Sequence, residues 1–135
     1  MSQPIEITVR GYHLDVFRHV NNARYLEFLE EARWAFLDAA DVYARCEERG
    51  LGLAVAEIDI RYRKPAHMND RIVVDAKIQE IGRATVKIAQ TVTLKDSGAK
   101  LADAAVTIAL FNLNTGRPIR LDDDLRALFA RADAA

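Results

Sequence analysis

Residues 20–44 carry apolar side chains at steps of three and four residues, which is the spacing of one face of a helix. Polar residues gather on the opposite side, but the apolar arc is much wider than a helix on a protein surface needs. Gly50 and Gly52 close the region. The pattern therefore predicts one long helix over residues 20–44 that other elements surround on most of its circumference.

Most of the remaining chain has the alternating pattern of β-strands. Apolar and polar residues alternate at 5–10 before the helix, and after it at 54–63, 72–78 and 84–95. Residues 101–113 are apolar on nearly both faces, as expected for a strand that is covered on two sides. A shorter helical pattern over residues 121–132 ends the chain. A run of strands after one long helix favours an α+β fold with a mostly antiparallel sheet. We expect a sheet of about five strands curled around one long central helix.

The length of 135 residues fits one domain. No repeat, low-complexity stretch or charge block interrupts the pattern, so residues 1–135 are expected to form a single domain. The sequence contains no run of about 18 uncharged apolar residues, so it predicts no membrane-spanning helix. The single cysteine, Cys46, and the absence of an export signal favour a cytoplasmic location.

The charge balance and the glycine and histidine patterns exclude several kinds of site. Nineteen Lys and Arg stand against 20 Asp and Glu, a net charge of −1 that suits nucleic-acid binding poorly. The glycines form neither a dinucleotide-binding motif nor a phosphate-binding loop. His13, His19 and His67 lack the spacing of a metal site, so we expect no metal and no cofactor.

Nucleophilic serine or cysteine chemistry has little support. The two serines are Ser2, near the chain end, and Ser97, in a turn, and neither lies in a G-x-S-x-G motif. Cys46 lies near the predicted helix C-terminus, where the helix dipole disfavours a thiolate. A hydrolase of this sequence would therefore need another catalytic group.

The junction between residues 11 and 25 is rich in polar groups where the long helix begins. Asn21 and Asn22 are suitable residues for a helix start, whose unpaired N–H groups and positive dipole can hold an oxyanion. Asp15 lies six to seven residues earlier, and its ionised carboxylate suits a general base or a nucleophile. Alternatively, Asp15 is a turn residue and the asparagines only cap the helix. The spacing leaves both interpretations open.

The sequence VRGYHLDVFRHVNNARYLEFLEEARW at residues 9–34 resembles the hotdog-fold acyl-CoA thioesterases of the 4-hydroxybenzoyl-CoA thioesterase type. The segment IRYRKPA at residues 60–66 resembles a second part of the same family. Within the family, the chain is particularly similar to the bacterial long-chain acyl-CoA thioesterase III branch. That branch shares His13-Leu14-Asp15 where many relatives have Glu-Thr-Asp.

The resemblance implies a sheet wrapped around a helix and a homodimer or homotetramer with the active site at the dimer interface. It places the catalytic carboxylate on Asp15 and the oxyanion-polarising backbone N–H on Asn22. It places an aromatic site residue on Tyr25, and it makes His19 and Asn21, in the same motif, substrate-binding candidates. The expected reaction is hydrolysis of a long-chain fatty acyl-CoA to the free acid and CoA, with Asp15 activating water or attacking directly.

Basic residues near the predicted site have two interpretations each. Arg61, Arg63 and Lys64 form a compact cluster at a strand end that could bind the CoA phosphates, or a solvated strand face. Arg18, where many relatives have glycine, could contact the phosphates or only solvent.

Other functions stay open at this point. An aryl-CoA, short-chain acyl-CoA or acyl-carrier-protein thioesterase would keep the fold and the chemistry. A non-catalytic acyl-CoA-binding protein is the alternative from another class, although Asp15 and the helix-start donors are both present.

Overall fold

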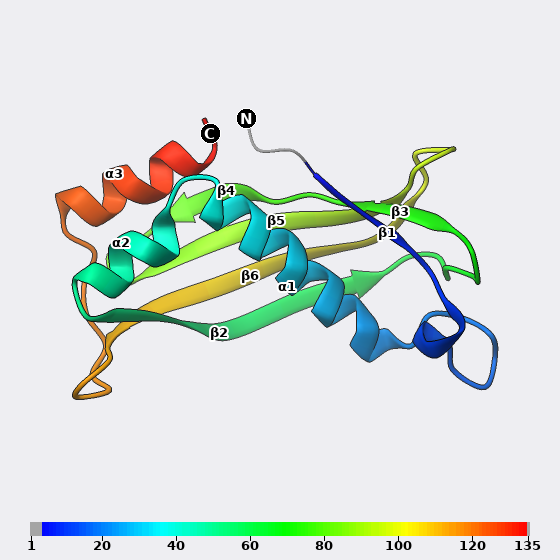
Figure 1. Ribbon diagram of the computed structural model, residues 1–135, viewed down its shortest axis with the longest axis horizontal. Helices are drawn as coiled ribbons and strands as arrows, with labels where there is room; N and C mark the ends of the chain where they lie inside the picture. The colour runs from blue at the N-terminus through cyan, green and yellow to red at the C-terminus, as the bar shows by residue number, and fades with distance from the viewer. Residues whose placement is uncertain (1–3, 135) are drawn as a thin grey trace.

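The computed structural model describes residues 4–134 and contains a six-stranded sheet with three α-helices (Figure 1). The strands are β1 (Ile5–Thr8), β2 (Leu51–Tyr62), β3 (Arg71–Val74), β4 (Lys77–Ile81), β5 (Thr85–Leu94) and β6 (Lys100–Asn112). The helices are α1 (Asn22–Asp38), α2 (Val42–Glu48) and α3 (Asp123–Ala132), with a 3-10 helix at Gly11–His13. The sheet order is β1-β3-β5-β6-β2, with β4 beside β5, and all pairs are antiparallel. The α+β class with an antiparallel sheet is confirmed.

The predicted single strand over residues 72–78 is wrong, which is why the sheet has six strands and not five. Strand β3 ends at Val74. The carboxylate of the next residue, Asp75, accepts the Thr91 N–H at 2.8 Å and the Thr91 hydroxyl at 2.6 Å. β3 and β4 then pair with successive parts of β5. Because both halves face the same side of the sheet, the apolar alternation continues through the break and conceals it.

The predicted continuous helix over residues 20–44 is also wrong. α1 ends at Asp38 and α2 begins at Val42, with Asp41 between them in the left-handed region at φ 58°. Aspartate is one of the few residues besides glycine that adopt this conformation readily, so no Gly or Pro marks the break. The apolar pattern continues because Val42 of α2 packs into the same cluster as Phe36 of α1.

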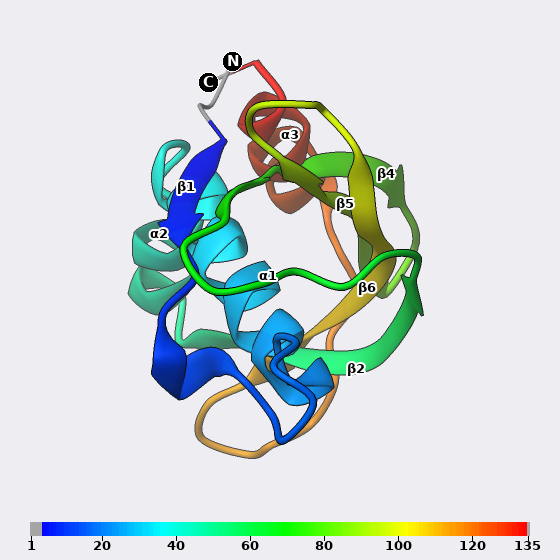
Figure 2. The same ribbon diagram turned by 90° about the vertical axis from the view of Figure 1, so that its right-hand side faces the viewer.

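α1 lies on the concave side of the curved sheet, as the end-on view shows (Figure 2). Its first half packs Tyr25, Phe28 and Leu29 into an apolar cluster with strands β3, β5 and β6. Its second half packs with α2, α3 and the other end of the sheet in a second cluster. Burial of these side chains removes apolar surface from water, which is the main force holding α1 against the sheet.

A buried polar contact also fixes α1 to the sheet. Arg33 of α1 is 4% exposed and donates to the Gln90 Oε1 of β5 at 3.2 Å. Gln90 Nε2 in turn donates to the carbonyls of Leu29 at 3.0 Å and Asp75 at 3.2 Å. Burial lowers the pKa of Arg33 from its ordinary value. This contact joins α1, β5 and the corner between β3 and β4.

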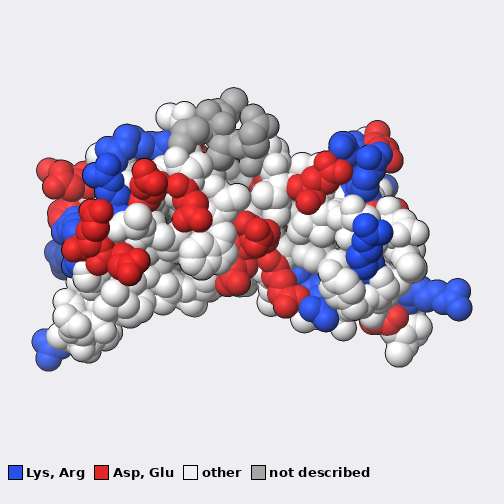
Figure 3. Space-filling model, viewed as in Figure 1, with Lys and Arg blue, Asp and Glu red and all other residues white. Residues whose placement is uncertain are grey.

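The outer side of α1 carries exposed acidic residues, among them Glu27, Glu30 and Glu31. Figure 3 shows acidic side chains over the middle of this face and basic ones toward both ends. None of the helices that the structure describes is long and apolar enough to cross a membrane.

Candidate active site

A cavity of about 310 Å³ lies at the N-terminus of α1, between the loop that precedes the helix and the end of β2. Its lining comprises Asp15, Val20, Asn22, Tyr25, Tyr62, Arg63, Lys64 and Pro65. Residues from two separate parts of the sequence, 15–25 and 62–65, thus meet in one place. Of the predicted site residues, His19, Asn21 and Arg61 are not in this lining.

Asp15 sits at the base of a tight loop closed by a bridge between Leu14 and Val20. Its Oδ1 accepts the N–H groups of Phe17 at 2.8 Å and His19 at 3.3 Å. Its Oδ2 accepts no hydrogen bond from any residue in the range 4–134. Asp15 is therefore a turn residue through one oxygen, and its second oxygen is available for chemistry.

Arg18 lies in the same loop in the left-handed region, at φ 64°. Glycine adopts this conformation without steric cost, which accounts for the glycine that many relatives of the resembled family have here. The Arg18 side chain is exposed.

The start of α1 presents one unpaired backbone donor to the cavity. Asn21 is the N-cap: its Oδ1 accepts the Ala23 N–H at 2.9 Å and its carbonyl accepts the Arg24 N–H at 2.9 Å. Asn21 also donates its own N–H to the His13 carbonyl at 2.8 Å. The Asn22 N–H, first in the helix, donates to no acceptor among the described residues. This N–H adds to the positive end of the helix dipole beside Asp15.

Two tyrosines form the wall between α1 and β2. Tyr25 is 3% exposed, and its ring meets the Tyr62 ring edge-on with the centroids 5.3 Å apart. The Tyr62 hydroxyl donates to the Asn22 carbonyl at 3.0 Å, which ties β2 to the first turn of α1. Burial raises the pKa of both phenols, so both stay neutral at physiological pH.

Tyr62 is a site residue that the sequence patterns did not reveal. It stands in an alternating strand pattern like any other β2 residue. Only the packing of β2 against the helix start gives its hydroxyl the Asn22 carbonyl as acceptor.

The three basic residues predicted for the CoA phosphates differ in their ion pairs and in the cavities that they line. Arg63 lines the cavity but is ion-paired with Asp103 of β6 at 3.0 Å. Arg61 lies beside Asp59 and Asp103 in a neighbouring hollow of about 290 Å³, which Arg63 also lines. Lys64 lines the cavity and forms no ion pair with a described residue. Lys64 is thus the basic residue best placed to meet an anionic substrate group at this site.

The histidines near the cavity do not form a metal centre. The rings of His19 and His67 meet edge-on at 5.1 Å, and His67 Nδ1 lies 3.7 Å from Asp70 Oδ2. Within the part of the chain that the structure describes, no three His, Cys, Asp or Glu residues lie close enough to hold a metal ion. His19 contributes to the site through its backbone N–H on Asp15.

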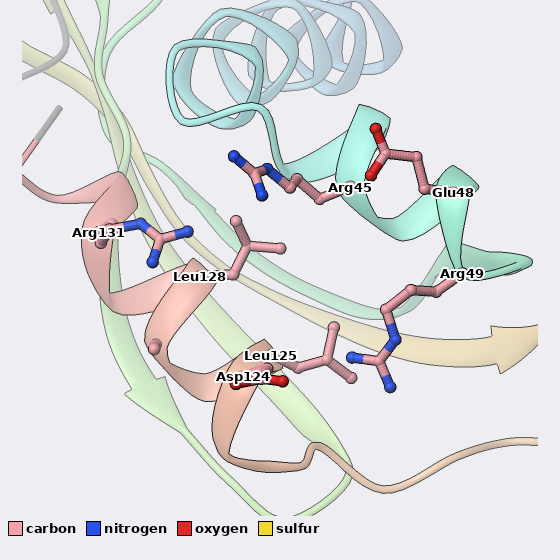
Figure 4. A pocket seen from close by; sticks show the side chains of 8 residues that line it. Arg45, Glu48, Arg49, Asp124, Leu125, Leu128 and Arg131 are labelled. Carbon is pink, nitrogen blue, oxygen red and sulfur yellow. The ribbon is translucent and has the colours of Figure 1, made fainter.

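A second cavity, of about 320 Å³, lies between α2 and α3 (Figure 4). Arg45 and Arg131 point into it across Leu128, and Arg49 at its edge is ion-paired with Asp122 at 2.7 Å. The last residues of α2 and the first turns of α3 line it, and its carboxylates, Glu48 and Asp124, stand among three arginines. The Leu125 N–H in this lining already donates to Asp122 Oδ1 at 2.9 Å, whereas the first cavity offers the Asn22 N–H beside Asp15.

Cys46 and Ser97 line neither of the two cavities. Cys46 is fully buried, and this burial raises the pKa of its thiol. The Ser97 hydroxyl accepts the Ala99 N–H in an exposed turn. Ser2 lies outside the described residues.

Comparison with known proteins adds an independent observation. Residues 9–129 match the model of the thioesterase-like superfamily. The chain is 40% identical over 121 residues to the long-chain acyl-CoA thioesterase FadM of Escherichia coli, covering 90% of this chain and 92% of that protein. It is 29% identical to the chloroplastic acyl-acyl carrier protein thioesterase ATL3 of Arabidopsis thaliana, covering 93% of this chain and 66% of that protein. The crystal structure of the probable thioesterase YbaW from Escherichia coli superposes with a TM-score of 0.91 at 37% identity, covering 97% of this chain and 98% of that one.

Proposed function

Because the chain belongs to the thioesterase-like superfamily, we propose that it hydrolyses long-chain fatty acyl-CoA to the free fatty acid and CoA. Its sheet and helices have the hotdog fold that the sequence resemblance implies. The observation that carries the proposal is that one cavity holds both an Asp15 oxygen and the Asn22 N–H, neither of which has a hydrogen-bond partner among residues 4–134. A base or nucleophile beside an oxyanion donor is the minimum that thioester hydrolysis requires.

In the proposed reaction, the Asn22 N–H donates to the thioester carbonyl oxygen, and the dipole of α1 stabilises its developing negative charge. In the first route, Asp15 Oδ2 takes a proton from a water molecule while the water oxygen attacks the carbonyl carbon. In the second route, Asp15 Oδ2 itself attacks the carbonyl carbon. The carbon–sulfur bond breaks in both routes and the thiolate of CoA takes up a proton. In the second route, water then hydrolyses the acyl-Asp15 anhydride.

The proposed substrate differs from the alternative substrates in its acyl group and in the carrier to which that group is attached. The similarity to FadM supports a long-chain acyl-CoA, and the similarity to ATL3 supports acyl carrier protein as the alternative carrier. Thiol release from CoA esters of increasing chain length, with benzoyl-CoA and an acyl carrier protein ester beside them, should give the highest kcat/KM for the long-chain CoA esters. A preference for benzoyl, short-chain or carrier-protein esters would assign one of the rival substrates. Tight binding of all CoA esters without turnover would assign a binding protein.

Lys64 is proposed to contact a phosphate of CoA. Lys64→Ala should raise KM for an acyl-CoA several-fold, since an ion pair with a phosphate contributes about tenfold or less when partly exposed. The acyl-pantetheine ester lacks the nucleotide phosphates, and its KM should not change. Arg61→Ala is the matched control, because Arg61 lies in the other hollow. Equal effects of both substitutions on the CoA ester would contradict this role.

We further propose a homodimer that joins two sheets through β2 and completes the site. β2 is 12 residues long and pairs only with β6 among the described strands, so one edge is open to another chain. Near the cavity, the Tyr62 and Phe17 side chains are 47% and 76% exposed in the single chain, which suits a second copy covering them. Light scattering should give at least twice the chain mass of 15.1 kDa. A mass of one chain for the active protein would contradict the proposal.

Two broader expectations accompany this function. A cytoplasmic location, expected from the lone cysteine, and a single domain over residues 1–135 both stay predictions. Neither affects the chemistry proposed for Asp15 and Asn22.

A further inference from the structure

His13 is a buried histidine that contacts both halves of the candidate site without lining the cavity. It closes the 3-10 helix at Gly11–His13 and is 7% exposed. Its ring packs on Tyr12 at 4.1 Å and meets Phe28 of α1 edge-on at 5.2 Å. Its Nδ1 accepts the Arg10 N–H at 2.8 Å, and its backbone N–H donates to the Arg10 carbonyl at 3.0 Å. The imidazole is thus held by two aromatic rings and through one nitrogen.

The backbone of His13 connects this turn to the catalytic groups. Its carbonyl accepts the Asn21 N–H at 2.8 Å, and Asn21 directly precedes Asn22. Asp15 follows His13 by two residues. A movement of His13 would therefore shift the carboxylate and the helix-start N–H relative to each other.

The bond from Arg10 requires a lone pair on Nδ1, so the neutral ring carries its proton on Nε2. Protonation would put a hydrogen on Nδ1, which then points at the Arg10 N–H and cannot accept it. The charged form of His13 is thus incompatible with the observed turn.

The surroundings of His13 favour its neutral form. Burial lowers its pKa most, the positive charges of Arg24 and Arg10 lower it further, and Glu27 opposes them. The Glu27 carboxylate lies 2.8 Å from the Arg24 guanidinium. Since the pKa is lower in the folded than in the unfolded chain, the folded protein loses stability as the pH falls below the ordinary histidine value of about 6.5.

We propose that His13 is a positioning residue whose unprotonated Nδ1 and backbone carbonyl hold the Asp15 loop in register with the first turn of α1, and whose protonation reversibly inactivates the enzyme at acid pH. This inference rests on the proposed roles of Asp15 and Asn22. We therefore expect that the loss of activity at low pH reflects in part the protonation of His13, a group that does not touch the substrate.

Two substitutions separate the acceptor of His13 from its ring. His13→Asn places Oδ1 near the position of Nδ1, so it keeps an acceptor for Arg10 but does not titrate. His13→Phe keeps an aromatic ring against Tyr12 and Phe28 but has no acceptor. At neutral pH, His13→Phe should lower kcat by about tenfold or more with little change in KM, because small misplacements of catalytic groups are costly. His13→Asn should keep kcat near wild type and stay active at a lower pH than wild type.

The Arg10 amide provides a readout that needs neither substrate nor variant. In wild-type protein, the NMR shift and the hydrogen exchange of the Arg10 N–H should change with the titration of the His13 ring. Wild-type kcat in His13→Phe, identical acid limbs for His13→Asn and wild type, or an Arg10 amide indifferent to that titration would each overturn the proposal. Failure of the proposed function is a separate result: wild-type protein at neutral pH would then release no thiol from any acyl-CoA.

Discussion

Asp15→Asn should lower kcat/KM for acyl-CoA hydrolysis by about 10²–10⁴-fold, the usual loss when a general base is removed. The structure indicates that this substitution removes the catalytic group and keeps the turn. Asp15 Oδ1 accepts the Phe17 and His19 N–H groups, and an asparagine oxygen can accept both in its place. The change replaces Oδ2, which has no partner among the described residues, by an amide that cannot act as a base or nucleophile. The turn should therefore survive while hydrolysis is lost.

The measurement is thiol release from a long-chain acyl-CoA, with thermal unfolding recorded for each variant. Asp70→Asn is a matched control, because Asp70 also closes a turn, through the His67 N–H at 2.8 Å, but is not in the cavity lining. The control should retain near wild-type activity. If folded Asp15→Asn hydrolysed the substrate at a near wild-type rate, Asp15 would not be the catalytic carboxylate.

Local patterns in the sequence predicted those features that depend on neighbouring residues. The alternation over residues 84–95 and the nearly continuous apolar stretch over residues 101–113 correspond to β5 and β6 within one or two residues. Asn21 and Asn22 stand at the start of α1, because an asparagine side chain can accept a first-turn N–H. Apolar spacing predicted which parts of the chain bury a face, since burial depends on side chains a few positions apart.

Breaks within continuous apolar patterns were not predictable in the same way. The left-handed Asp41 interrupts the helix, and the Asp75 contact with Thr91 interrupts the strand, but both breaks keep the same face buried. Apolar periodicity records which face is buried and not whether the backbone is continuous.

Site contacts between distant residues also needed the fold. The Tyr62 hydroxyl donates to the Asn22 carbonyl across 40 positions, and Arg63 is ion-paired with Asp103 across the same separation. No spacing along the sequence reports either contact. The loop that carries Asp15 was recognisable because its residues are close in sequence, whereas the wall opposite it comes from β2.

Asn22→Pro should lower kcat by about 10²–10³-fold, which is the usual loss on removing one oxyanion donor. Proline has no N–H, so the substitution removes the backbone N–H that is proposed to stabilise the oxyanion. The first position of a helix is the one where proline is favoured. The preceding Asn21 has φ −59° and ψ 136°, the extended conformation that a residue before proline prefers. The helix and the carbonyl that accepts Tyr62 should therefore persist.

Asn22→Ala is the matched control, because it removes the side chain and keeps the backbone N–H. Asn22 is exposed, and its side chain has no hydrogen-bond partner among the described residues, so alanine should hydrolyse acyl-CoA at near wild-type kcat. Binding of free CoA by both variants, measured by calorimetry, should match wild type and show that the proline ring does not block the cavity. If folded Asn22→Pro and Asn22→Ala had equal kcat, the Asn22 N–H would not be the oxyanion donor and another group would have to supply it. A loss confined to proline would place it on the Asn22 backbone, since the two variants both lack the side chain and only alanine retains the N–H.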